Sequence, residues 1–216
     1  MELESQQNTT ENLVYFFQAA EYFWDTALEA HRCRKFGLAD QNFLEALKKY
    51  NVCSNLDPSN HYYFHQMGMC LYSLSYFPDA EAKNKSLLIA HDAFKCAIDL
   101  HKHAHPKPDV DQKCVRAMYI RDLADCLIEQ KRFRAADLIL AEALAIDPTP
   151  LSLAFSGVLK ATYLGQKETG KILFDEAFNA AARGKNDELT ADIYAYILKL
   201  GRESGLIPLL SLVRQL

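Results

Sequence analysis

Two amphipathic stripes lie between Val115 and Pro148, separated by a short polar turn, and they constrain the fold more strongly than any other feature of the chain. Their apolar residues recur every three or four positions, which is the period of a helix and not the alternation of a strand. Helices joined so tightly run antiparallel and bury their stripes against each other, while a second apolar edge of the pair needs a neighbour. The stripes are Ile120, Leu123, Ala124 and Leu127, then Ala136, Leu140, Ala143 and Leu144, with Gln130–Phe133 as the turn. The pattern predicts an all-α chain of stacked helical hairpins.

The sequence that closes the second stripe recurs elsewhere in the chain. Asn55–Pro58 and Ala145–Pro148 end two predicted helices alike, and Cys96–Leu100 repeats the pattern without the proline. The unit around Val115–Pro148 resembles the tetratricopeptide repeat (TPR), a helix-turn-helix of about 34 residues with a fixed order of large, small and proline positions. The resemblance implies a right-handed superhelix of antiparallel helical hairpins. It is carried by Ile120, Leu123, Ala124, Leu127, Ala136, Leu140 and Pro148.

Three further units match the repeat in part. In the unit before the best match, the second half arrives ten residues late, which predicts an insertion over 75–86. In the first unit, the candidate first helix lies six residues early, which predicts a long connection over 34–40. The matching positions are Trp24, Ala27, Leu28, His31, Ala46, Tyr50 and Pro58; Phe64, Met67, Gly68, Leu71, Ala90, Phe94 and Ala97; and Ala154, Gly157, Val158, Ala161, Gly170, Phe174 and Ala177.

We therefore expect one TPR-like domain over 1–216. Within it, an N-terminal helix occupies 11–35 and degenerate repeats, about four of them, cover 20–183. The remaining segment, 186–216, reads as two helices broken near Gly201–Gly205. Such a pair suits the cap that a repeat array needs at its end, because the last repeat has no following neighbour to cover its apolar edge.

Composition and charge limit the partners. The 24 Lys and Arg residues against 28 Asp and Glu give a formal charge of −4, which argues against a nucleic-acid surface. No apolar run approaches the roughly 20 residues of a membrane span, and the first ten residues lack the features of a signal peptide. We expect a cytoplasmic protein with no nucleic-acid partner and no membrane span. The six cysteines show no Cys-x-x-Cys spacing, so we interpret all of them as reduced, buried, small hydrophobes.

The resemblance also implies a binding surface. In the TPR family the first helices line a concave groove that holds peptides or protein segments, and four positions of each repeat face it. The corresponding residues are Tyr62, His65, Met69 and Tyr72; Met118, Arg121, Asp125 and Ile128; and Ser152, Phe155, Leu159 and Thr162. Repeats that clamp a chaperone's C-terminal carboxylate need several basic residues there, and only Arg121 is available. The prediction is a non-enzymatic adaptor or chaperone without a cofactor, which holds a partner with bulky apolar side chains. This lining is similar to that of the TPR chaperones of bacterial type III secretion.

Two alternatives concern what covers the predicted groove. The segments Val14–Phe17 and Tyr22–Trp24 are very apolar for a solvated arm, so the N-terminal helix could cover some groove positions instead of a partner. A large exposed apolar surface implies either a partner or a cover. A second copy of the chain is the other alternative, which makes the protein a self-associating scaffold and a possible homodimer.

The remaining alternative is a metal- or nucleotide-dependent enzyme. His101 and His105 lie four residues apart on one helix face, a spacing that can ligate zinc. A full site needs three or four ligands, and imidazoles near a helix C-terminus are also favourable as cations, so we expect no metal ligand. The 165–171 loop spells most of a phosphate-binding loop, but Ile172 replaces the hydroxyl residue that holds magnesium. We interpret this loop as a helix-helix turn with Gly165 at a helix C-terminus.

Overall fold

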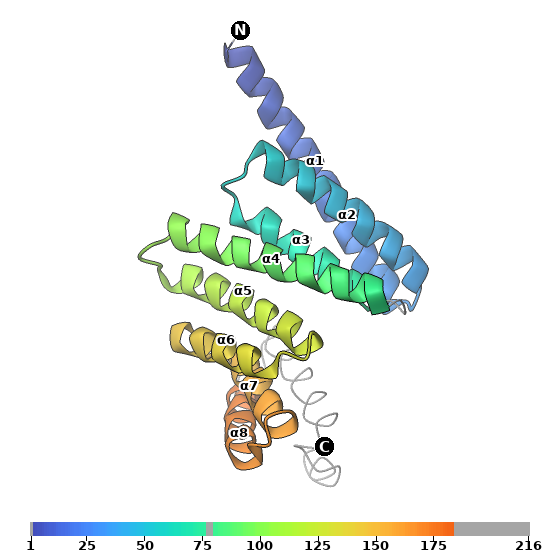
Figure 1. Cartoon of the computed structure of the whole chain (residues 1–216). Helices are drawn as coiled ribbons and strands as arrows, with labels where there is room; N and C mark the ends of the chain where they lie inside the picture. Colours follow the sequence, from blue (N-terminus) through green and yellow to red (C-terminus); the bar gives the residue numbers. More distant parts are fainter. Residues whose placement is uncertain (1, 77–79, 184–216) are drawn as a thin grey trace. The chain divides into compact units, whose positions relative to one another are not determined.

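Residues 2–76 and 80–183 are described by the computed structural model, and in these ranges it contains helices and no strand. Contacts divide the chain into two compact units, an N-terminal unit (Met1–Pro108) and a C-terminal unit (Asp109–Leu216). Each is considered by itself. The helices are α1 (Glu2–Arg32), α2 (Phe36–Leu56), α3 (His61–Leu74), α4 (Ala80–Ala104), α5 (Val110–Glu129), α6 (Phe133–Ile146), α7 (Pro150–Thr162) and α8 (Lys167–Arg183) (Figure 1). The predicted all-α fold is confirmed.

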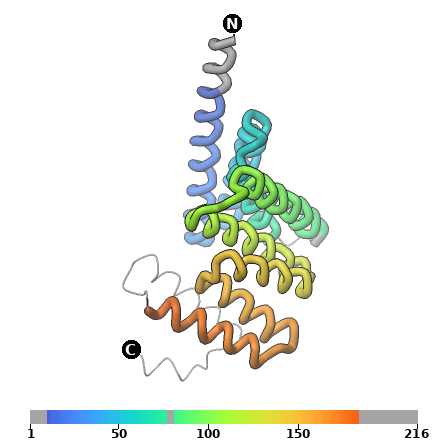
Figure 2. The backbone as a smooth tube through the Cα atoms, turned by 90° about the vertical axis from the view of Figure 1, so that its left-hand side faces the viewer, coloured from blue at the N-terminus to red at the C-terminus, as the bar shows by residue number. Residues whose placement is uncertain are grey.

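The N-terminal unit consists of two antiparallel hairpins in which each helix packs on the next along the chain. α1 contacts α2, α2 contacts α3, and α3 contacts α4 (Figures 1 and 2). The core around α1 and α2 combines alanines with aromatic rings. The ring centroids of Trp24 and Phe43 lie 5.3 Å apart, and Ala20 and Ala46 are buried in the same cluster. Small residues let helices approach closely and large ones fill the remaining space, so the hairpins interlock.

The predicted connection over 34–40 is wrong, because α1 ends at Arg32 and α2 begins at Phe36. Arg34 adopts a left-handed conformation with φ 57°, which reverses the chain within three residues. The backbone N–H of Lys35 then donates to the carbonyl of Ala30 at 2.8 Å and closes the end of α1. The residues that exceed the repeat consensus lengthen the helices, and α1 accordingly begins well before the predicted position 11.

The predicted insertion over 75–86 is also taken up mainly by helix. α3 ends at Leu74 and α4 begins at Ala80, so most of the extra residues add turns to the start of α4. This segment is rich in Ala, Glu and Lys, which have high helix propensity. Leu87, just after it, is fully buried and anchors the lengthened helix to the unit's core.

In the C-terminal unit, the hairpin predicted over 115–148 is confirmed as α5 and α6. A capping box starts α5, in which the Asp109 side chain accepts from Gln112 N–H at 2.9 Å and the Gln112 side chain accepts from Asp109 N–H. The turn between the helices is Gln130–Arg132, with Lys131 in the left-handed region at φ 59°. Of the predicted stripe residues, Leu144 is half-buried and the others are buried: Ile120, Leu123, Ala124, Leu127, Ala136, Leu140 and Ala143.

The second hairpin of this unit is α7 and α8. Thr149 caps α7 by accepting a hydrogen bond from Ser152 N–H, and Pro150 occupies its first turn. The rings of Phe133, at the start of α6, and Tyr163, at the end of α7, stack with their centroids 4.4 Å apart and hold the two helices together. Phe174 of α8 is fully buried in the core of this hairpin. The predicted capping helices over 186–216 lie outside the described residues.

The cysteine interpretation holds for half of the thiols. Cys53, Cys70 and Cys126 are buried and free, as expected of small core residues. For Cys33 and Cys114 the interpretation is wrong, because Cys33 lies in the exposed α1–α2 connection and Cys114 on an exposed face of α5. Cys96 is half-buried. Among the described residues, no helix combines the length and apolarity needed to cross a bilayer.

Candidate functional site

Tyr62, the first predicted groove residue of α3, contacts the N-terminal helix. Its hydroxyl donates to Oε1 of Glu21 at 3.1 Å and accepts from the Gln66 amide at 2.6 Å. Its ring also meets Phe17 edge-on, with the ring centroids 6.1 Å apart. At this position α1 covers the side chain, as the alternative of a covering N-terminal helix anticipated.

The other predicted residues of α3 have different surroundings. His65 is buried, with its ring centroid 5.6 Å from that of Phe94 in α4, so it belongs to the hairpin core. Met69 and Tyr72 are half-buried. The hydroxyl of Tyr76 donates to the hydroxyl of Tyr72 at 2.8 Å. Met69 and Tyr72 therefore remain partly exposed, whereas Tyr62 contacts α1 and His65 is buried.

In the C-terminal unit, the predicted groove residues of α5 form a continuous row of partly exposed side chains. All four predicted residues on α5 are half-buried, and we call Met118, Arg121, Asp125 and Ile128 the α5 row. Arg121 Nη2 lies 3.2 Å from Oδ1 of Asp122, which fixes the guanidinium close to the helix. On α7, Phe155 is half-buried whereas Leu159 is fully buried.

Glu21 joins three helices through hydrogen bonds, a role that the sequence prediction missed. One oxygen, Oε1, accepts from both Tyr50 and Tyr62, so the carboxylate joins α1 to α2 and α3. Burial and the hydrogen bond to Glu21 raise the pKa of Tyr50, and burial chiefly raises the pKa of Tyr62 to about 12. A lone carboxylate beside Ala20 in an otherwise apolar segment is the only sequence signal that could have indicated this role.

Three histidines of the N-terminal unit meet at one corner of the α3–α4 hairpin. His61 is the first residue of α3, and His101 lies in the last turn of α4. His105 directly follows the end of α4, and its backbone N–H donates to the carbonyl of His101 at 2.9 Å. The ring centroid of His61 is 4.7 Å from that of His101 and 6.0 Å from that of His105. The sequence paired His101 with His105 correctly but missed His61, because forty positions separate it from His101.

The electrostatics of this corner favour the neutral form of His61. Burial lowers the pKa of His61, and the neighbouring His105 and His65 lower it further because two imidazolium charges repel. His101 is almost fully buried, while His61 and His105 are half-buried. His61 and His105 therefore leave part of their rings open to solvent, while His101 lies inside the unit.

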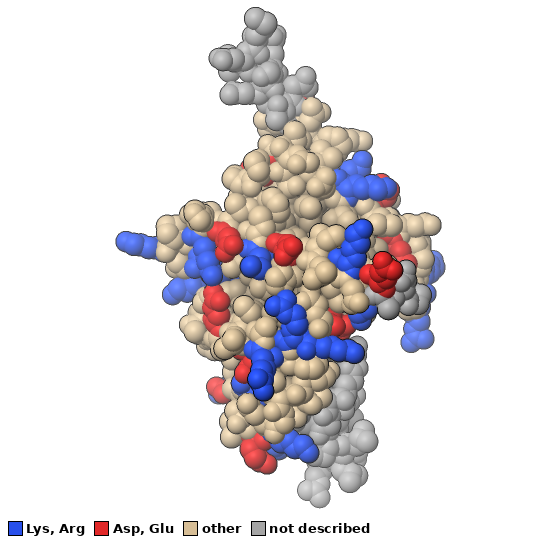
Figure 3. Space-filling view, in the orientation of Figure 1, with Lys and Arg blue, Asp and Glu red and all other residues tan. Residues whose placement is uncertain are grey.

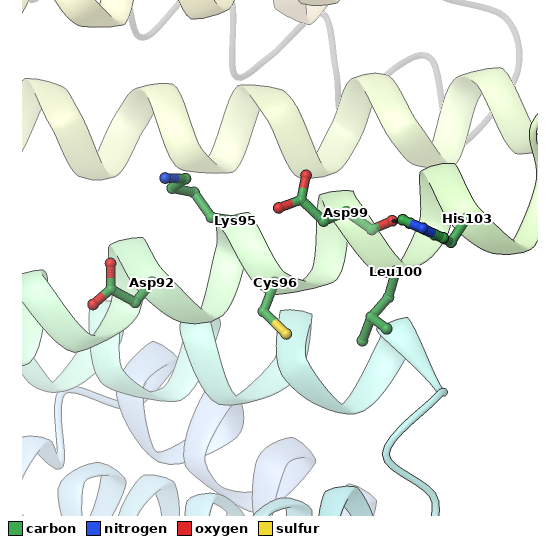
Figure 4. A pocket seen from close by; sticks show the side chains of 6 residues that line it. All are labelled: Asp92, Lys95, Cys96, Asp99, Leu100 and His103. Carbon is green, nitrogen blue, oxygen red and sulfur yellow. Dashed lines mark hydrogen bonds between the residues drawn. The ribbon is translucent and has the colours of Figure 1, made fainter.

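His103 faces another direction. Its Nδ1 lies 3.2 Å from the backbone carbonyl of Asp99, on the exposed side of α4. There it borders a shallow hollow of about 470 Å³, visible in Figure 4. The lining residues are Asp92, Lys95, Cys96, Asp99, Leu100 and His103. Because all six belong to one helix, the hollow is an open face and brings no residues from other elements together.

The 165–171 loop forms the predicted helix-helix turn. Gly165 has φ 69° and follows the end of α7, so a helix and not a strand precedes the loop. Lys171, the residue that would reach a phosphate, donates to Oδ2 of Asp175 at 2.5 Å. A Cβ atom on Gly170 would lie 2.5 Å from the carbonyl oxygen of Gly157, so this glycine serves helix packing. The residues of this loop thus support the hairpin.

On the face of the molecule drawn in Figure 3, charged residues do not separate into regions of one sign. On the face in view, Lys and Arg are interspersed with Asp and Glu (Figure 3). This distribution agrees with the small net charge of −4. Long-range attraction of a strongly charged partner therefore contributes little, and local contacts decide what binds.

Comparison with known proteins identifies the fold. The sequence matches no family model and no curated protein. The structure is similar to the crystal structure of a thermophilic TPR protein from Thermus thermophilus, with a TM-score of 0.55 and 14% sequence identity. The match covers 83% of this chain and 98% of that one. The chain therefore has an all-α, TPR-like solenoid fold.

Proposed function

We propose that the protein is a binding module that takes an extended segment of a partner protein along the α5 row. One observation carries the proposal: the buried stripe of α5 fills the hairpin core, while the whole α5 row on the same helix remains half-exposed. A helix in a hairpin of this kind needs only one apolar face for folding. Met118 and Ile128, outside that buried stripe, are available for a partner.

The chemistry of the α5 row defines the segment that would bind. Met118 and Ile128 are ten residues apart, which corresponds to about 15 Å along a helix. An extended peptide spans this distance in about five residues. Burying one bulky apolar side chain at each end would contribute roughly 1.5–3 kcal/mol per side chain. Arg121 and Asp125, between the two, would pair with polar groups of the peptide backbone or side chains.

A peptide-display selection tests this proposal. Peptides are selected on the full chain, and the dissociation constants of the enriched sequences are measured by fluorescence anisotropy. The double variant Met118→Asp/Ile128→Asp is expected to weaken binding at least about a hundredfold, because each of the two burials is worth more than one decade in affinity. The matched control is Leu138→Asp, since Leu138 is 74% exposed on α6 of the same hairpin. Equal affinity in the wild type and the double variant would overturn the proposal.

In the N-terminal unit, Met69 and Tyr72 are the residues that we propose to contact a partner. In the C-terminal unit, Phe155 of α7 is a further proposed contact. Tyr62 and His65 are better explained by their contacts with α1 and Phe94. Tyr72→Ala is therefore expected to weaken capture of any peptide that spans α3 while leaving the melting temperature nearly unchanged. A large fall in Tm would assign Tyr72 to the core instead.

Self-association is a second candidate, favoured by exposed apolar side chains on α1. Val14, Tyr15 and Tyr22 have exposed fractions of 49%, 65% and 66%. A second copy of the chain could bury this surface through the same helix. Light scattering at two concentrations tests it: a mass that doubles with concentration in the wild type and remains monomeric in Tyr15→Asp/Tyr22→Asp would support a dimer through α1.

A further inference from the structure

We propose that His61, His101 and His105 form a binding site for a divalent transition-metal ion, with zinc as the expected ion. The site belongs to the N-terminal unit alone and lies where α3 begins and α4 ends. It is separate from the α5 row, so it stands or fails independently of the proposed partner binding.

The geometry of the three rings carries this proposal. One ring nitrogen of each histidine can be chosen so that all three lie within 4.8 Å of one another. In a tetrahedral zinc site with Zn–N distances near 2.0–2.1 Å, ligand nitrogens are about 3.3 Å apart. Each nitrogen would have to move inward by about 0.9 Å at most to reach that spacing. A small rotation of each side chain achieves such a displacement without moving either helix.

The two helices hold the rings in suitable directions. His101 and His105 are four residues apart, so the helix places them on one face, one turn above the other. Asn60 caps α3 by accepting from Tyr62 N–H at 3.1 Å, which fixes the start of the helix and with it His61. The ring planes are inclined to one another by 52–67°. Rings inclined in this way can direct nitrogen lone pairs at a common point.

The ligand set selects the class of ion. Three imidazoles suit Zn²⁺, Cu²⁺, Ni²⁺ and Co²⁺, whereas Mg²⁺ and Ca²⁺ prefer oxygen ligands. Zinc accepts three histidines and leaves its fourth position to water or another ligand. His61 and His105 are half-buried at the edge of the unit, so an ion can enter from solvent.

Binding would cross-link the two helices of one hairpin. Because His61 and His101 are forty residues apart in the chain, an unfolded chain could not hold the three ligands together. A ligand that binds only the folded state raises its stability. The proposed consequence is a metal-dependent rise in the Tm of the protein.

The experiment uses the full chain after treatment with a chelator. Zinc chloride is titrated by calorimetry, and cobalt chloride serves as a spectroscopic probe of the coordination geometry. We expect one ion per chain, a tetrahedral cobalt spectrum and a higher Tm with zinc. His61→Ala and His105→Ala should each lower the zinc affinity at least about tenfold, because each removes one of three ligands.

His103→Ala is the matched control, since His103 lies two residues from both His101 and His105 but is exposed and faces away. The zinc affinity of His103→Ala should stay within about twofold of the wild-type affinity. Because His101 is almost fully buried, a substitution there would disturb the core, and the test therefore uses His61 and His105. Three results would overturn it: no stoichiometric zinc binding by the wild type, unchanged affinity in His61→Ala, or an equal loss in His103→Ala.

Discussion

The hydroxyl of Tyr50 donates a hydrogen bond to Oε1 of Glu21 at 2.5 Å, which joins α2 to α1 across 29 positions of the chain. Tyr50 is fully buried, and Tyr62 of α3 donates to the same oxygen at 3.1 Å. One carboxylate therefore connects three helices of the N-terminal unit. Hydrogen bonds to a charged group are stronger than those between neutral groups, so this contact helps to fix how the first hairpin meets the second.

Tyr50→Phe removes this donor and keeps the ring. We expect the free energy of unfolding to fall by about 1.5–3 kcal/mol, the range for a hydrogen bond to a charged group. Urea unfolding followed by circular dichroism measures the loss. Tyr22→Phe is the control, because Tyr22 is 66% exposed, and it should change the stability by less than about 0.5 kcal/mol. Equal stability of the two variants would show that the Glu21 contact contributes nothing.

Gly157→Ala tests the close approach of α7 and α8. A Cβ atom at this position would lie 2.7 Å from the carbonyl oxygen of Gly170 and 2.9 Å from the backbone nitrogen of Phe174. Both are backbone atoms that cannot rotate away, so we expect a loss of about 1–3 kcal/mol in unfolding free energy.

Gly37→Ala is the matched control for that substitution. Gly37 lies in the first turn of α2, and a Cβ atom there would meet nothing within 4 Å. Alanine in an unhindered helix position should stabilise the protein by roughly 0.5–1 kcal/mol. Thermal unfolding of the two variants should therefore shift in opposite directions, and shifts of the same sign would contradict this account of Gly157.

The thiols should react in the order of their exposure. Cys33 is exposed, and Cys114 is exposed with a pKa raised by partial burial and by Asp147. We expect a disulfide reagent to modify Cys33 quickly and Cys114 more slowly in the native protein. The buried Cys53, Cys70 and Cys126 should react only after denaturation. Mass spectrometry of the labelled peptides distinguishes the sites, and rapid native labelling of Cys70 would contradict the described core.

Stability should decrease at alkaline pH. Burial raises the pKa of Cys53 to about 11 and that of Cys126 to about 12, above the value near 8.5 of an unfolded chain. Between these values the unfolded chain has lost protons that the folded protein retains, so the unfolding free energy falls with rising pH. The thiols' contribution is complete below about pH 8.5 and is lost progressively toward pH 11–12.

Urea midpoints measured under reducing conditions across this range provide the test. Cys53→Ala should show a smaller decline than the wild type, because one of the titrating groups is absent. Cys33→Ser, which changes an exposed thiol, should follow the wild-type curve. If Cys53→Ala and the wild type decline in parallel, groups other than this thiol control the alkaline transition.

Local patterns in the sequence predicted the helices well. The stripe at Ile120, Leu123 and Leu127 is a property of neighbouring turns, so periodicity alone identified α5 and its buried face. Lengths were less predictable, since repeat spacing predicted a long connection over 34–40 and an insertion over 75–86. The structure instead has α2 and α4 running through most of these residues, because continuing a helix costs little once it has formed.

The candidate sites were predicted only where one helix supplies the residues. The pairing of His101 with His105 follows from helix spacing, and so does the single face of Met118, Arg121 and Ile128. Glu21 and His61 could not be found in this way. Their partners lie on other helices, and nothing in the local sequence specifies which side chains a hairpin brings together.

The sequence by itself determined the all-α class, the helix pairs and the residues that fill their interiors, because helix period and turn chemistry act between residues a few positions apart. The packing of hairpins decided the rest. It placed α1 over Tyr62, buried His65 beside Phe94 and gathered His61 with His101 and His105 where α4 ends. Such contacts depend on which faces of distant helices meet, and that is settled only when the complete core is filled.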